Sequence, residues 1–102
     1  MKYYVKFDCL GKMSEGSPEQ ILKGQELIGR QIEHIEKSGK MKDGGPLLGT
    51  RGGYFILDVN KPAEILGLLG RVFLENFNIE IHPVLSFKEM SEFMQEEYKK
   101  AA

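Results

Sequence analysis

The chain has 102 residues, of which 41% are hydrophobic and 28% charged, and its 14 Lys and Arg against 15 Asp and Glu give a formal net charge of −1. This length predicts one domain over residues 1–102, and the composition is that of a globular protein. Because there is no basic excess to neutralise phosphates, the balance of charge argues against nucleic acid as a partner.

Cys9 is the only cysteine, which excludes an intramolecular disulfide and a cysteine-rich zinc site. His34 and His82 lack metal-ligand spacing, so we expect no metal. The glycine-rich stretch 44–53 lacks the Gly-Lys-Ser/Thr ending of a phosphate-binding loop, and we interpret it as a hairpin. We therefore expect no cofactor. Charges interrupt the first eight residues, and no apolar stretch reaches the ~18–20 residues of a membrane span. We therefore expect a cytoplasmic protein with no membrane partner.

Periodicity predicts the elements of the first half of the chain. Residues 3–9 alternate between apolar and polar, as a strand does. Ser17 and Pro18 form a helix start, isoleucines then recur at helical spacing from residue 21 to 35, and Ser38-Gly39 gives a stop. The glycine-rich stretch that follows is expected to hold a short strand around 46–49 and then a turn.

The second half repeats the pattern. Residues 53–59 form a nearly continuous apolar run, which predicts a central strand. A second helix is expected after Asn60-Lys61-Pro62, and the alternating residues 78–84 predict the last strand, with Pro83 favouring an edge or a strand end. Ser86 and Glu89 have the spacing of a capping box before a terminal helix over about 87–100.

The order of these elements predicts the fold. Residues 17–22 and 61–66 are alike, and each follows a strand. Together with the order β-α-β-β-α-β, this repeat indicates an α+β, ferredoxin-like sandwich with an antiparallel sheet of strand order 4-1-3-2. The C-terminal helix is an addition to that plan.

Alternation also assigns side chains to the two faces of the sheet. The face covered by helices is expected to hold an apolar set: Val5, Phe7, Cys9, Phe55, Leu57, Val59, Ile79 and Ile81. The open face receives a mixture of aromatic, aliphatic and charged groups: Tyr4, Lys6, Asp8, Tyr54, Ile56, Asp58, Glu80, His82 and Val84. Such a face predicts a partner, and a homodimer with two sheets packed together would cover it.

Three segments resemble a known family. They are residues 4–8, residues 49–59 and, above all, Phe77-Asn78-Ile79-Glu80-Ile81-His82-Pro83-Val84, and they look like muconolactone isomerase and its relatives in the dimeric α/β-barrel superfamily. The resemblance covers about residues 3–86. It implies a ferredoxin-like protomer that pairs its sheet with that of a second copy into a barrel, with higher assembly allowed. It also implies a ligand cleft between sheet and helices or between the sheets. The chain differs from the family pattern at 70–76, at His82 and in its terminal helix.

His82 and Glu80 are the candidate catalytic residues. An imidazole beside a carboxylate can take a proton from a carbon next to a carbonyl, and Lys6 or Arg51 can stabilise the resulting enolate. Glu80 is equally a candidate for the base, and the strand spacing of roughly 7 Å suggests that it orients His82 only indirectly. The alternative is that these charges form only ion pairs at a dimer interface, for example Lys6 with Glu80. The candidate ligand-binding residues are Tyr4, Lys6, Asp8, Arg51 and Tyr54.

Two functions remain open at this point. One is a cofactor-independent isomerase that transfers protons on a small molecule carrying a carboxylate. The other is a non-catalytic binding protein or oligomeric accessory protein. His34 is expected in solvent and Cys9 in the core. The apolar stripe of the terminal helix is expected to make subunit contacts, or to pack in the core, and consists of Phe87, Met90, Phe93, Met94 and Tyr98.

Overall fold

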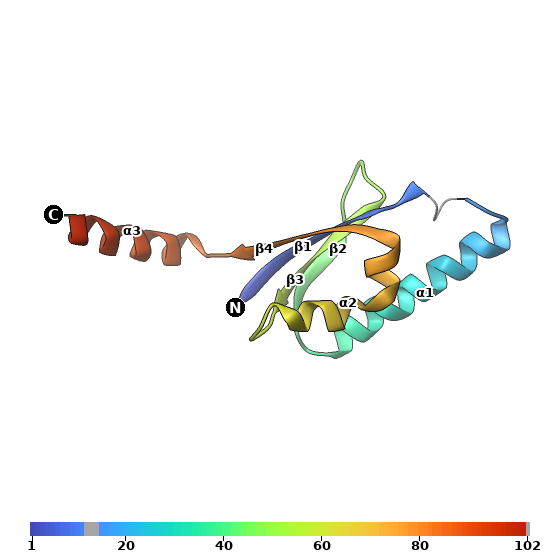
Figure 1. Ribbon diagram of the computed structural model, residues 1–102, viewed down its shortest axis with the longest axis horizontal. Coiled ribbons are helices and arrows are strands. Elements are labelled where there is room, and N and C mark those ends of the chain that lie inside the picture. The colour runs from blue at the N-terminus through green and yellow to red at the C-terminus, as the bar shows by residue number, and fades with distance from the viewer. Residues whose placement is uncertain (12–14, 102) are drawn as a thin grey trace.

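The computed structural model describes residues 1–11 and 15–101 and has one four-stranded antiparallel sheet with two helices on one face (Figure 1). The strand order β2-β3-β1-β4 is the predicted order read from the other edge, and it confirms the ferredoxin-like α+β fold. The elements are β1 (Lys2–Cys9), α1 (Pro18–Lys37), β2 (Met41–Pro46), β3 (Gly52–Asp58), α2 (Ala63–Asn76), β4 (Phe77–Val84) and α3 (Phe87–Ala101).

Helix α1 begins and ends where the sequence signals lie. The Ser17 hydroxyl accepts a hydrogen bond from the backbone N–H of Gln20 at 3.2 Å, and the Gln20 side-chain oxygen accepts one from the N–H of Ser17 at 2.9 Å. This reciprocal pair satisfies two of the N–H groups that a helix start leaves without partners. At the other end Gly39 takes a φ of 76°, which favours glycine and ends the helix.

Strand β2 lies earlier than predicted. The sequence pattern placed it around 46–49, whereas it runs over Met41–Pro46 and pairs with β3. Gly44 is needed there because β2 and β3 approach closely. A Cβ at Gly44 would lie 3.0 Å from the carbonyl oxygen of Tyr54 and 3.2 Å from the Phe55 ring. A strand built around such glycines lacks the β-branched and alternating pattern by which strands are recognised.

The core lies between the sheet and the two helices. The Phe73 ring of α2 packs 5.0 Å from the Phe7 ring, 4.9 Å from the Phe77 ring and 5.6 Å from the Phe55 ring, centroid to centroid. Such aromatic contacts add to the free energy gained by burying the rings. The buried core residues are Tyr3, Val5, Phe7, Ile35, Phe55, Leu57, Val59, Ile65, Leu68, Leu69, Phe73 and Phe77.

Two parts of the predicted core depart from expectation. Ile81 is 37% exposed, and burial on this face of the edge strand β4 falls from Phe77 through Ile79 to Ile81. Cys9 and Ile79 are only partly buried against the core. The helices therefore cover the end of β4 nearest α2 and leave its far half open.

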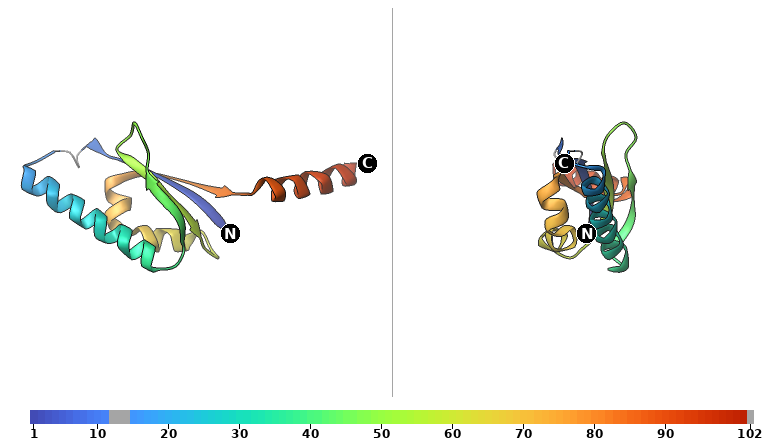
Figure 2. Two further views of the ribbon diagram at one scale, coloured as in Figure 1. Left: turned by 180° about the vertical axis from the view of Figure 1, so that it is seen from behind. Right: turned by 90° about the vertical axis from the view of Figure 1, so that its right-hand side faces the viewer.

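Helix α3 projects away from the body of the protein (Figure 2). Its N-terminus has the predicted capping box, since the Ser86 hydroxyl accepts the backbone N–H of Glu89 at 3.0 Å. No residue in the described range of α3 is buried, and Phe87 is 96% exposed. The prediction that its apolar stripe packs in the core is therefore wrong for this protomer, and subunit contacts remain a prediction. None of the described helices is long and apolar enough to cross a bilayer.

Candidate functional site

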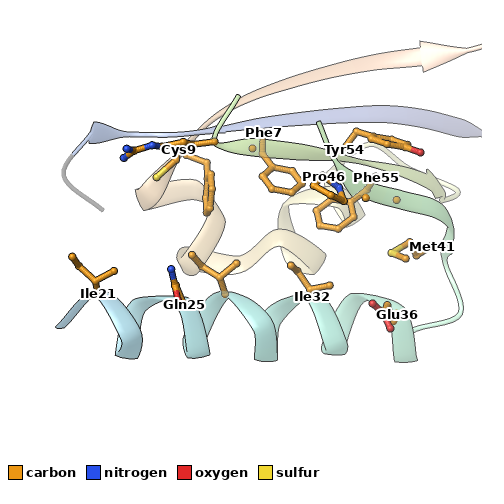
Figure 3. A pocket seen from close by; sticks show the side chains of 16 residues that line it. Phe7, Cys9, Ile21, Gln25, Ile32, Glu36, Met41, Pro46, Tyr54 and Phe55 are labelled. Carbon is orange, nitrogen blue, oxygen red and sulfur yellow. The ribbon is translucent and has the colours of Figure 1, made fainter. Parts of the chain in front are cut away.

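A cleft of about 740 Å³ lies between α1 and the helix-covered face of the sheet (Figure 3). One wall is α1. The other is formed by the C-terminal half of β1, the N-terminal half of β3, strand β2 and the start of β4. The cleft is lined by Phe7, Cys9, Ile21, Gln25, Ile28, Ile32, Glu36, Met41, Gly44, Gly45, Pro46, Arg51, Gly52, Tyr54, Phe55 and Phe77.

The residues of α1 that line the cleft share one face of the helix because of their spacing. The lining residues of this helix lie three or four positions apart, so they form one stripe along successive turns. Ile35, which is fully buried, fixes the side of α1 that faces the protein. Three isoleucines of the stripe leave an apolar surface, and two polar residues complete it: Ile21, Gln25, Ile28, Ile32 and Glu36.

The two ends of the cleft carry opposite charges. The backbone N–H of Cys9 donates to the carbonyl of Arg51 at 3.0 Å, which holds Arg51 beside the end of β1. Cys9 and Ile21 lie at one end of the cleft, and Glu36 and Met41 lie at the other (Figure 3). Arg51 and Glu36 therefore border the cleft at opposite ends, and both residues are exposed.

The open face of the sheet carries a row of rings. The Tyr4 ring stacks on the Tyr54 ring at 5.8 Å and on the His82 ring at 6.4 Å, centroid to centroid. The row crosses three neighbouring strands, with Tyr54 on β3, Tyr4 on β1 and His82 on β4. Tyr4 and His82 are also register partners. Lys6 is opposite both Tyr54 and Glu80, so the predicted site residues of β1 and β4 are neighbours.

Two close pairs of charged groups on this face join side chains of the same strand. His82 Nε2 lies 3.7 Å from Glu80 Oε2, although the two side chains are 62% and 60% exposed. This distance is longer than a hydrogen bond, so the expectation that Glu80 orients His82 only indirectly stays a prediction. Lys6 Nζ lies 3.6 Å from Asp8 Oδ2, whereas the pair anticipated from the sequence was Lys6 with Glu80.

Asp43 on β2 is a site neighbour that sequence reasoning missed. The Tyr54 hydroxyl donates to Asp43 Oδ2 at 3.1 Å. This hydrogen bond, with the carboxylate charge beside it, raises the pKa of Tyr54, because both disfavour the tyrosinate. With β2 placed too late along the chain, Asp43 fell outside the predicted sheet.

The predicted site residues thus fall on two sides of the sheet. Arg51 borders the cleft, and so does Tyr54, although its ring stacks on the open face. The others lie on the open face: Tyr4, Lys6, Asp8, Glu80 and His82. Gln25 and Glu36 of the cleft were missed, although their spacing from Ile21 signals the same helix face. Among residues 1–11 and 15–101, no three His, Cys, Asp or Glu side chains gather as a metal site requires.

Comparison with known proteins supports the fold alone. Neither protein-family models nor curated proteins match this chain. Among solved structures it is similar to the 5-chloro-2-hydroxyhydroquinone dehydrochlorinase TftG from Burkholderia phenoliruptrix AC1100, in complex with 2,5-dihydroxybenzoquinone, at 15% identity and a TM-score of 0.64 over 86% of this chain and 97% of that one. It is also similar to muconolactone isomerase, at 13% identity and a TM-score of 0.66 over 84% of this chain and 90% of that one.

The resemblance to muconolactone isomerase inferred from the sequence is therefore confirmed as a likeness of fold.

Proposed function

We propose that the protein binds a small, largely apolar molecule in the cleft between α1 and the sheet. The observation that carries this proposal is the cleft itself. Its volume of about 740 Å³ is within the range of ~300–1,000 Å³ typical of small-molecule sites. Its lining is mostly apolar and includes three isoleucines and three phenylalanines, with a few polar groups, which is the usual composition of such sites.

Arg51 gives this site a preference for acidic ligands. A guanidinium can hold a carboxylate through two parallel hydrogen bonds. Glu36 at the other end repels an anion, so the acidic group of a ligand is directed to the Arg51 end. The bound quinone of the TftG structure carries acidic hydroxyl groups on a ring, which makes 2,5-dihydroxybenzoquinone and benzoate suitable first probes.

Calorimetric titration of the protein with these two probes tests the proposal. Ile28→Trp should fill the cleft and abolish binding, whereas Leu27→Trp, one position away and outside the cleft lining, should leave it unchanged. Arg51→Met should weaken benzoate about tenfold or more but leave benzyl alcohol unaffected. Binding that survives Ile28→Trp in a folded variant would place the ligand elsewhere.

A second candidate function is proton transfer on the open face, favoured by the 3.7 Å approach of His82 to Glu80. His82 or Glu80 would remove a proton from a carbon next to a carbonyl of a lactone and return it to another carbon, with no net change in oxidation. Lys6 would stabilise the enolate oxygen, and Tyr4, Asp8 and Tyr54 would contact the substrate. This is the isomerase chemistry that the family resemblance implied.

Incubation with muconolactone in deuterated water, followed by NMR, tests this second function. Exchange of the hydrogen next to the carbonyl should be catalysed by the native protein and lost in His82→Gln. Glu80→Gln should also impair it, whichever of the two residues is the base. His34→Gln is the matched control, because His34 is exposed on α1 and away from the sheet. Equal exchange in His82→Gln and His34→Gln would remove His82 from the mechanism.

We also propose that two copies pair their open sheet faces. Ile56 and Val84 lie on that face among the rings and charges and are only partly buried in one protomer. Burying such a mixed surface against its own copy forms a two-fold interface. Sedimentation equilibrium should give twice the protomer mass, and Ile56→Lys should shift the protein to monomer. A native protein that stays monomeric would contradict this pairing.

A further inference from the structure

We infer that the cleft takes an elongated carboxylic acid, with its acid group at Arg51 and an acyl chain along α1, in preference to a compact ring. The inference deepens the proposed binding function and depends on it. It names a class of ligand, a chain acid, which no comparison with known proteins suggests.

The length of the cleft is the first argument. Its lining on α1 extends from Ile21 to Glu36, which at ~1.5 Å per residue corresponds to roughly 22 Å of helix. A single ring spans one or two turns of ~5.4 Å, so it would leave most of this apolar wall in water. An extended chain can contact Ile21, Ile28 and Ile32 together.

The facing wall is apolar along the same line. The rings of Phe7 and Phe55 lie across the cleft from α1, and Met41 lies toward the Glu36 end (Figure 3). Phe77 also lines the cleft. A methylene chain suits such a wall because it makes van der Waals contact and requires no hydrogen bonds.

Charge gives the chain a direction. Arg51 is near the Cys9 end and Glu36 at the opposite end, so a carboxylate is attracted at one end and repelled at the other. The acid group therefore belongs at Arg51 and the methyl end toward Ile32 and Met41. An uncharged chain of the same length lacks the attraction to Arg51.

Calorimetric titration of the full chain with hexanoate, octanoate and decanoate, and with decanol, tests the inference. Each buried methylene should tighten binding by up to about fourfold, so decanoate should exceed hexanoate by about two orders of magnitude. Arg51→Met should weaken decanoate at least tenfold and leave decanol unchanged. An affinity that does not change with chain length would overturn the inference.

One pair of variants measures the length of the occupied cleft. Ile32 lies about 16 Å along the helix from Ile21, so Ile32→Trp should block tetradecanoate, whose extended chain reaches this far, while hexanoate still binds at the Arg51 end. Glu33→Trp, the next residue and outside the lining, is the matched control. Equal loss of both acids in a folded Ile32→Trp variant would contradict a chain lying along α1.

The outcomes separate this inference from the function on which it rests. If benzoate binds through Arg51 and chain length has no effect, the binding function stands and the chain acid is rejected. If neither benzoate nor decanoate binds, both are rejected. If decanoate binds only after Phe93→Ser, the exposed apolar stripe of α3 from a second copy occupies the cleft in the native protein. The natural occupant would then be that helix and not a chain acid, which overturns the inference.

Discussion

The two faces of the sheet differ in what covers them, and this difference locates function. On the covered face the rings pack at 4.9–5.6 Å around Phe73, but α1 stands off from the sheet at β2 and leaves a cleft. On the open face the rings of Tyr4, Tyr54 and His82 stand at 5.8 and 6.4 Å beside charged groups that reach solvent. The first face offers apolar surface to a small molecule, and the second is the face that we propose pairs with a second copy.

The largest expected contrast comes from two neighbouring residues of β3. Phe55 is 3% exposed and packs on Phe7 and Phe73, so Phe55→Ala should cost about 3–5 kcal/mol of unfolding free energy. Tyr54→Ala on the other face should cost the protomer about 1 kcal/mol or less. Urea denaturation at several protein concentrations measures both. A loss for Tyr54→Ala that grows with protein concentration would indicate that a second copy covers the open face.

Two glycines of α2 test how the covering layer is built. Gly70 has a φ of 65° and a ψ of −178°, which only glycine adopts readily, and an added Cβ would lie 3.2 Å from the Gln31 side chain. Gly70→Ala should therefore destabilise by about 1–3 kcal/mol. Gly67→Ala, in open space on the same helix, should stabilise by about 0.5–1 kcal/mol. Similar melting temperatures for the two variants would contradict the kink at Gly70.

The ion pair between Lys40 and Glu64 links the residue before β2 to the start of α2. Its Nζ–Oε2 distance is 2.9 Å, and the hydrogen bond from Lys40 lowers the pKa of Glu64 from its ordinary value of 4.5. A carboxyl whose pKa is lower in the folded state stabilises the fold above its unfolded pKa and loses that contribution as the pH falls through the folded pKa.

Lys40→Met should therefore destabilise the protein at neutral pH, and the difference from the native protein should vanish in acid below the folded pKa of Glu64. Thermal unfolding across this pH range measures it. Arg71→Met is the matched control, because its pair with Glu75 is largely exposed and should contribute little at any pH. A constant deficit for Lys40→Met down to low pH would contradict the role of Glu64.

The smallest expected effect is a titration on the open face. Asp43→Asn removes the charge that raises the pKa of Tyr54, so that pKa should fall toward its ordinary value. The ultraviolet absorbance of tyrosinate follows the change, with Tyr54→Phe identifying the residue. An unchanged titration in Asp43→Asn would show that the hydrogen bond does not form in solution.

Local patterns predicted most of the fold because each is carried by a few adjacent residues. Alternation over 3–9 and the apolar run over 53–59 were enough to identify β1 and β3, and strand periodicity assigned their side chains to two faces. Strand β2 was misplaced because Gly44 and Gly45 carry no pattern. The exposure of Ile81 was missed because it depends on how far α2 extends over β4.

The candidate site was predicted only in part for a related reason. The neighbours on the open face follow from strand register, which the sequence indicates. The cleft depends on the distance between α1 and the sheet, which is a property of packing and not of any local pattern. Arg51 was named for its place in a hairpin, and only the fold brings it to the same cavity as Ile28.

Amide chemical-shift mapping by NMR during a titration with tetradecanoate tests the central claim most directly. We predict that the largest shifts fall on Gln25, Ile28, Ile32 and Arg51, with little change at Lys6, Glu80 and His82. Large shifts confined to these last three residues would contradict the account, because they would place the ligand on the open face of the sheet.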